Sequence, residues 1–146
     1  MQHTDIDTIA NAKTAIERIT AMNHKFMTHV KEYATTNDIP SWLQISEDAV
    51  AIDCFGHVAT AKPRPVCTSN NSYFMEYVFT VPFGDRMIEV TRFYLSEYGA
   101  ILDAPAAQSP VCDYNNSQIA RHLCGRALIG FLASPLLAPA PAQVQR

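Results

Sequence analysis

The sequence predicts an α+β protein: a five-stranded antiparallel sheet, connected as a meander, with a long N-terminal helix and a C-terminal helix packed on one face. Three observations lead to this fold class. Residues 72–95 alternate apolar and polar side chains around a glycine turn, the pattern of a long β-hairpin with one buried face. Residues 5–35 and 117–131 instead repeat apolar side chains every three or four positions, as helices that bury one side do. Helices before and after a run of strands are typical of a two-layer domain.

The hairpin sets the register of the predicted sheet. Gly84 and Asp85 are expected to form its turn, because glycine at the first central position suits a type II′ connection. One face is then core, and the other is polar near the turn and apolar only toward the open end. The predicted cross-strand pairs are Val81 with Ile88, Phe79 with Val90, Tyr77 with Arg92 and Met75 with Tyr94. At its open end the second face is expected to carry an apolar corner, which consists of Phe74, Phe93 and Leu95.

The first helix is predicted over Asp5 to Thr35, and its apolar side chains form a single seam. Two interpretations of this seam are open. In the favoured one, the helix lies across the sheet of its own chain. In the other, it pairs with the same helix of a second copy, and Asn23 fixes the register of the pair. The seam consists of Ile9, Ala12, Ile16, Ile19, Asn23, Phe26, Val30 and Tyr33.

Three shorter strands complete the predicted sheet. Two of them, residues 49–54 and 57–62, surround the turn at Phe55-Gly56, and Val50, Ile52 and Cys54 lie on one face of the first. The last, residues 100–102, follows a turn at 96–99.

A second helix is predicted to begin at Asn116 or Ser117, because both residues favour a helix N-terminus. Pro135 should stop or kink it. Its buried stripe would turn Arg121 and Arg126 outward. The stripe consists of Ala120, Leu123, Cys124, Ala127, Leu128 and Phe131.

Composition bounds the domain organisation and the class of partner. A chain of 146 residues, 48% hydrophobic and 17% charged, fits one globular domain. We expect that domain over residues 1–134, with the Pro/Ala-rich residues 135–146 as a disordered tail.

The net charge of −3 and the singly scattered basic residues argue against nucleic acid, which binds clustered Lys and Arg. No apolar run is long enough for a membrane span, and residues 1–13 do not resemble a secretory signal. A cytoplasmic location is therefore expected.

The cysteines and histidines give only a weak metal signal. The four cysteines should be free thiols in a reducing compartment. Cys54 and His57 have the spacing of metal ligands, and Cys67 follows them in the chain, but structural zinc sites usually combine two such close pairs. His122 and Cys124, two positions apart on a helix, point in different directions. Because no motif for a nucleophile or a phosphate loop occurs either, we predict no metal, no cofactor and no catalytic residues.

The candidate binding residues lie on the surface of the hairpin. Phe83 at the tip is flanked by Asp85 and Arg86, and aromatic residues and arginine dominate binding hot spots. The apolar corner is the second candidate, since an exposed apolar patch usually marks an interface. We expect it to join two copies as a two-fold homodimer; alternatively, the loop 105–114 covers it.

These expectations define a non-enzymatic intracellular protein-binding module, an adaptor or inhibitor of a partner protein or complex. Its negative charge would suit a basic partner. The alternative is a small-ligand or thiol/metal-binding protein that uses a pocket near Cys54, His57 and Cys67.

Overall fold

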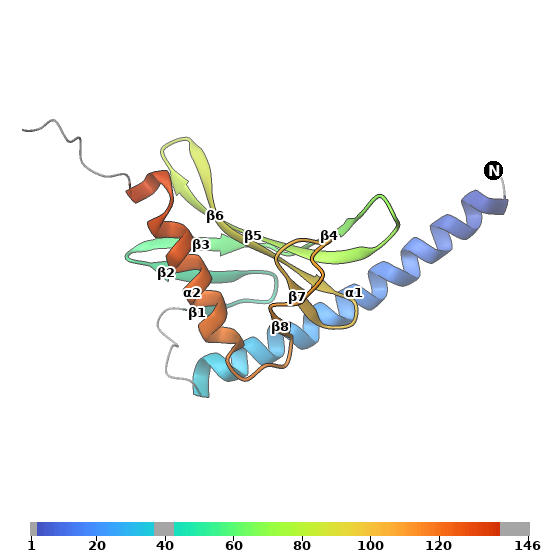
Figure 1. Cartoon of the computed structure of the whole chain (residues 1–146), viewed down its shortest axis with the longest axis horizontal. Coiled ribbons are helices and arrows are strands. Elements are labelled where there is room, and N and C mark those ends of the chain that lie inside the picture. The colour runs from blue at the N-terminus through green and yellow to red at the C-terminus, as the bar shows by residue number, and fades with distance from the viewer. Residues whose placement is uncertain (1–2, 37–42, 138–146) are drawn as a thin grey trace, which may run out of the picture.

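The computed structural model describes residues 3–36 and 43–137 of the chain (Figure 1). Helix α1 (His3–Thr36) precedes the strands, and helix α2 (Ile119–Leu132) and the short 3₁₀ helix η1 (Pro135–Leu137) follow them. The strands are β1 (Leu43–Ile45), β2 (Val50–Cys54), β3 (His57–Ala61), β4 (Arg64–Cys67), β5 (Tyr73–Phe83), β6 (Arg86–Ser96), β7 (Ala100–Leu102) and β8 (Cys112–Asp113). The predicted α+β class is confirmed.

The sheet is antiparallel and curled, and it has eight strands instead of the predicted five. Its order is β1-β2-β3-β5-β6-β7-β8, and β4 also pairs with β5, on the edge that β3 uses. Pro63 separates β3 from β4, so two short strands cover the length of β5 in succession. Strands of two to four residues are too short to show alternation. The prediction therefore found β7 only from the turn that precedes it, and it missed β1, β4 and β8.

The turn of the long hairpin and the pair Val81–Ile88 are confirmed, but the predicted register is wrong from Phe79 onward, away from the turn. Phe83 pairs with Arg86 across the turn, and Gly84 has a φ of 63°, in the left-handed region that glycine adopts readily. A β-bulge then adds Val90 to β6, so Phe79 pairs with Thr91. Farther along, Tyr77 pairs with Phe93, and Met75 pairs with Leu95. A shift of one residue moves side chains to the other face of a sheet.

The predicted apolar corner therefore does not form. Phe93 and Leu95 lie in the main core with 0% of their surface exposed. Phe74 is on the opposite face, where it packs with Tyr94 and Leu102 in a small second cluster. Ala107, from the loop between β7 and β8, packs against that cluster, so of the predicted corner only Phe74 lies on the side that this loop contacts.

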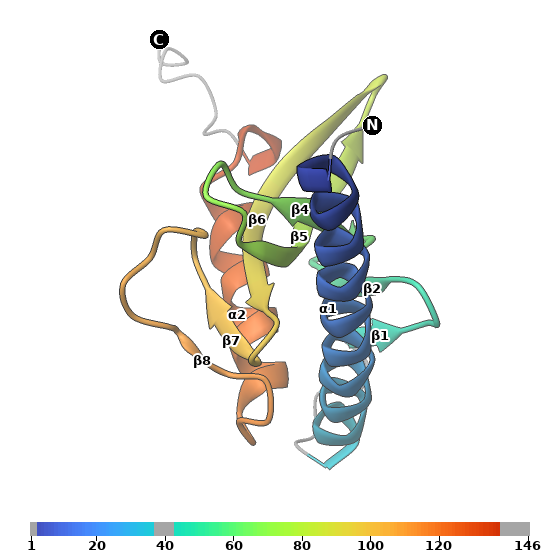
Figure 2. The same cartoon turned by 90° about the vertical axis from the view of Figure 1, so that its right-hand side faces the viewer.

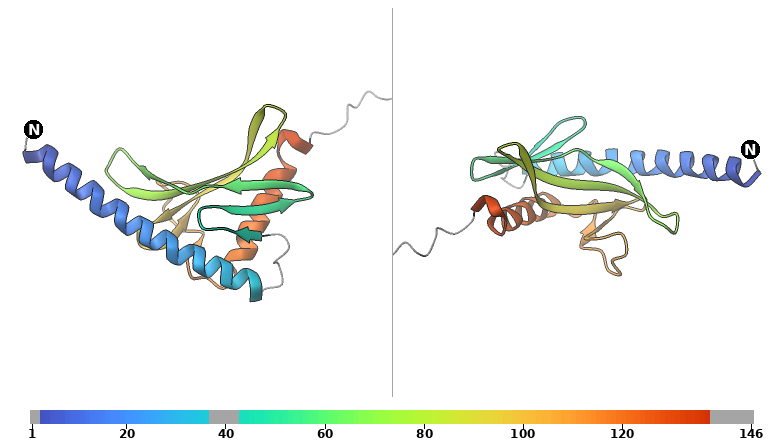
Figure 3. Two further views of the ribbon diagram at one scale, coloured as in Figure 1. Left: turned by 180° about the vertical axis from the view of Figure 1, so that it is seen from behind. Right: turned by 90° about the horizontal axis from the view of Figure 1, so that it is seen from above.

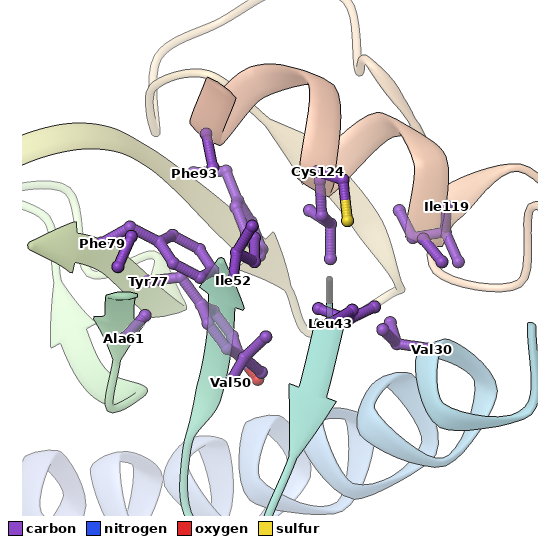
Figure 4. Packing of buried hydrophobic residues seen from close by; sticks show 14 of the residues in the cluster. Val30, Leu43, Val50, Ile52, Ala61, Tyr77, Phe79, Phe93, Ile119 and Cys124 are labelled. Carbon is purple, nitrogen blue, oxygen red and sulfur yellow. The ribbon is translucent and has the colours of Figure 1, made fainter. Parts of the chain in front are cut away.

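The main core lies between one face of the sheet and both helices (Figure 4). Tyr77 and Phe93 stack with ring centroids 4.6 Å apart, and Phe26 of α1 meets both rings edge-on. The hydroxyl of the buried Tyr77 donates a hydrogen bond to Oδ1 of Asn23 on α1. Burial raises the pKa of Tyr77, although that hydrogen bond acts in the opposite direction.

The buried side chains of helix α1 begin at Ala15. Ile19, Phe26 and Val30 are fully buried, so the favoured interpretation of the seam is confirmed for this part of the helix. Ile9 and Ile16 were expected in the same core but are 58% and 41% exposed. The N-terminal end of α1 extends beyond the sheet (Figure 1).

Helix α2 begins later than predicted, at Ile119, and its buried residues lie largely on the expected stripe. Arg126 does not turn outward: it pairs with Asp103, and its Nη2 donates to the carbonyl of Arg92 at 2.9 Å. The expected tail started at 135, but residues 135–137 form η1, and Leu136 packs partly against the core. Residues 138–146 lie outside the described residues.

Candidate interaction surface

The end of the β5–β6 hairpin projects past the rest of the sheet, as Figure 2 shows near its upper edge. Beyond Thr80, β5 pairs only with β6, and β7 pairs with β6 only at Tyr94 and Leu95. The projecting part is regular because the ladder continues up to the pair Phe83–Arg86. It therefore presents side chains on an ordered two-stranded support.

Two of the exposed side chains at this end are large and apolar: Phe83 is 49% exposed, and Met87 is 60% exposed. Phe83 pairs with Arg86 and Met87 pairs with Pro82, so the two side chains lie on opposite faces of the hairpin, one on each side of its tip. Asp85 and Arg86 stand between them in sequence and are also exposed. Within the described part of the chain, neither Asp85 nor Arg86 makes an ion pair. We call Phe83, Asp85, Arg86 and Met87 the tip surface. The sequence prediction placed its first three members correctly at the hairpin turn but missed Met87.

More apolar side chains are exposed on neighbouring segments. Figures 1 and 3 show the hairpin tip, the β2–β3 turn and the C-terminal end of α2 at the same end of the molecule. Phe55 in that turn is 67% exposed, and Ile129 and Leu132 on α2 are exposed as well. Phe131 between them is buried, and its ring centroid lies 5.9 Å from that of Phe55.

These neighbouring residues were not expected at a site. The sequence predicts Phe55 only as part of a turn and Leu132 at the end of the apolar stripe of the second helix, and it gives Ile129 no role. The sequence signal that could have identified them is the continuation of apolar residues beyond one helix face, at the C-terminal end of α2.

The three residues of the expected metal or thiol pocket, Cys54, His57 and Cys67, differ in exposure. Cys54 is buried in the core, whereas His57 and Cys67 are exposed. Burial, with the nearby charge of Asp53, raises the pKa of the Cys54 thiol, which disfavours the reactive thiolate. Among the described residues, no three His, Cys, Asp or Glu side chains come together as metal ligands would.

A charged network occupies the second face of the sheet, around Glu76. Its side chain accepts a hydrogen bond from Arg64 Nε at 2.8 Å and another from the Tyr94 hydroxyl at 2.9 Å. Arg92 lies 3.5 Å away and also binds Glu89. Burial raises the pKa of Glu76, but the hydrogen bonds from Arg64 and Tyr94 and the two positive charges outweigh it and hold the pKa below its usual value. This network connects β4, β5 and β6, because its side chains come from all three strands. Each of its carboxylates is paired with an arginine of the same chain.

A groove with a volume of about 750 Å³ runs between α1 and the β1–β2 turn. Both apolar and polar side chains line it, among them Met27, His24, Ile45 and Glu47. It lies next to the exposed part of α1.

Comparison with protein-family models, curated proteins and solved structures finds no match for this chain. Neither helix of the described residues combines the length and the apolar character needed to cross a membrane.

Proposed function

We propose that the protein is a non-enzymatic binding module that recognises a partner protein through the tip surface and acts as its adaptor or inhibitor. The observation that carries this proposal is the exposure of Phe83 and Met87 on a projecting, fully paired hairpin. Aromatic residues and methionine are enriched in the cores of protein interfaces, so these two side chains have the character of binding anchors.

The order of the hairpin supports the same proposal. Side chains that are already held on a paired ladder lose less conformational freedom on binding than those of a mobile loop. Asp85 and Arg86, which have no ion-pair partner in the described chain, could provide charge pairs at the rim of the interface. A cytoplasmic location and a partner of net positive charge are part of the proposal.

Affinity capture from native cells with the full-length tagged chain tests the tip surface. Phe83→Ser should lose a partner that the unchanged chain captures. Tyr98→Ser is the matched control, because Tyr98 is an aromatic residue that is 84% exposed. It lies in the β6–β7 turn, at the opposite end of β6 from the tip. Equal capture by all three proteins would contradict the proposal, as would a partner lost only with Tyr98→Ser.

Native mass spectrometry of the purified chain tests the small-ligand or metal alternative separately. A retained small molecule or metal ion, lost when Cys54 is replaced, would support that alternative. Release of any bound species should leave partner capture unchanged if the tip surface is the site.

A further inference from the structure

We propose that the N-terminal part of α1 binds the same segment of a second copy, so that two helices pair antiparallel around a two-fold axis. The starting observation is a stripe of three exposed isoleucines. Ile6, Ile9 and Ile16 are 51%, 58% and 41% exposed. At 100° per residue, they lie within an arc of about 80° on one side of the helix.

This stripe belongs to a part of α1 that has little support from its own chain. Of the side chains described between residues 6 and 14, Ala12 is half-buried and the others are exposed. Helical segments of this length gain little stability in water without tertiary packing. Burial of the stripe against a partner would provide that packing.

The spacing of the seam indicates that this partner is another helix. Ile9, Ile16, Asn23 and Val30 repeat every seven residues, whereas a straight helix has 3.6 residues per turn. The seam therefore drifts by about 20° per heptad around the helix axis. Val30 lies in the core, and Ile16 and Ile9 lie progressively farther toward solvent, on a heptad stripe that suits a helical partner.

Charge favours a second copy in antiparallel orientation. Lys13 lies within the arc of the stripe and Glu17 lies about 20° outside it. Neither makes an ion pair within the described part of the chain. A parallel pair would place each of these charges beside its own copy and would be repelled. In an antiparallel pair with its two-fold axis level with Ala15, Lys13 of each copy faces Glu17 of the other.

The same two-fold axis places two isoleucines of each copy opposite a hollow on the helix of the other copy. With Lys13 opposite Glu17, Ile9 falls opposite Ala21, and Ile6 falls opposite His24. Ala21 and His24 line a hollow of about 700 Å³ beside Ile16. His24 also lines the groove between α1 and the β1–β2 turn, so the surface that receives the second helix continues onto the body of the domain.

Sedimentation equilibrium of the full chain over a concentration series tests this pairing. We expect the mass to approach twice the 16.2 kDa of one chain as concentration rises. Ile9→Glu should reduce the mass to that of one chain and leave the melting temperature of the sheet domain nearly unchanged. Tyr98→Glu, at another exposed site, should associate like the unchanged protein.

A charge exchange separates this arrangement from other oligomers. Lys13→Glu alone and Glu17→Lys alone should each weaken association, because like charges then face each other. The double variant, Lys13→Glu with Glu17→Lys, should restore it. A chain that stays monomeric at every concentration, a dimer unaffected by Ile9→Glu, or a double variant as weak as both single variants would overturn the proposal.

Discussion

Gly130 of α2 lies directly against the backbone carbonyl of Val90, the residue that the β-bulge adds to β6. A Cβ atom at position 130 would lie 2.7 Å from the carbonyl carbon and closer still to the oxygen. Val90 has no partner in the β5 register, and the close approach of α2 covers it at the base of the projecting hairpin. The C-terminal part of α2 therefore packs against the bulge, at the base of the hairpin that carries the tip surface.

This contact predicts that Gly130→Ala destabilises the fold, although alanine has the higher helix propensity. Because the methyl group would meet backbone atoms, α2 or β6 must shift, and overpacking of this kind costs about 1–3 kcal/mol. Gly125→Ala is the matched control on the same helix, since a Cβ there meets nothing within 4 Å. That control should stabilise the protein by about 0.4–1 kcal/mol, which urea unfolding of both variants would measure. Equal changes in the two variants would show that α2 does not approach Val90 so closely.

The bulge also predicts which phenylalanine of the hairpin carries stability. Phe93→Ala should cost about 3–5 kcal/mol, the usual loss for a buried phenylalanine, because the side chain is fully buried. Phe83→Ala, at the exposed tip, should change the free energy of unfolding by less than about 1 kcal/mol. Denaturant titration measures both free energies of unfolding. A small loss for Phe93→Ala would contradict the observed register and favour the predicted one, which has no bulge.

The sequence predicted the fold class, both helices and the hairpin turn because each depends on a local pattern. Gly84 determines the turn. The apolar alternation of β5 also predicts the pair next to the turn correctly, because Val81 pairs with Ile88. No glycine or proline marks Val90 as the extra residue, and α2, whose Gly130 lies against Val90, is far along the chain. For this reason Phe93 was predicted on the wrong face.

The candidate surfaces were likewise predictable only where a local pattern determines them. Phe83 follows from the turn alone, so its exposure could be expected from the sequence. Ile16 shows the limit: a seam with heptad spacing looks like one face, but on a straight helix its N-terminal members rotate away from the sheet. Exposure of Ile16 depends on where the sheet ends, which the helix sequence does not contain.

The hydrogen bond between Tyr77 and Asn23 predicts a non-additive pair of substitutions. Asn23→Leu alone should cost about 1–3 kcal/mol, because it leaves the buried Tyr77 hydroxyl without an acceptor. Combined with Tyr77→Phe, which removes that hydroxyl, the same substitution should cost less than it does alone. A double-mutant cycle by urea unfolding measures the coupling, and strictly additive losses would show that the bond contributes nothing.

The network around Glu76 predicts how stability depends on pH. Its pKa is lowered in the folded protein, so its contribution is fully present above the ordinary value of about 4.3 and is lost as pH falls through the folded value. Glu76→Gln should therefore lower the free energy of unfolding at neutral pH by about 1.5–3 kcal/mol, the range for hydrogen bonds to a charged group. The difference from the unchanged protein should shrink as the pH falls below about 4.3.

Glu89→Gln is the control for this prediction. Its hydrogen bond with Arg92 also lowers the pKa of Glu89, but the side chain is 40% exposed, and such pairs contribute about 0–1 kcal/mol. Urea unfolding at a series of pH values compares the two variants. We expect the larger loss and the flatter acid limb for Glu76→Gln, because only its carboxylate is buried between Arg64, Arg92 and Tyr94. An acid limb as steep as that of the unchanged protein would show that Glu76 does not carry this dependence.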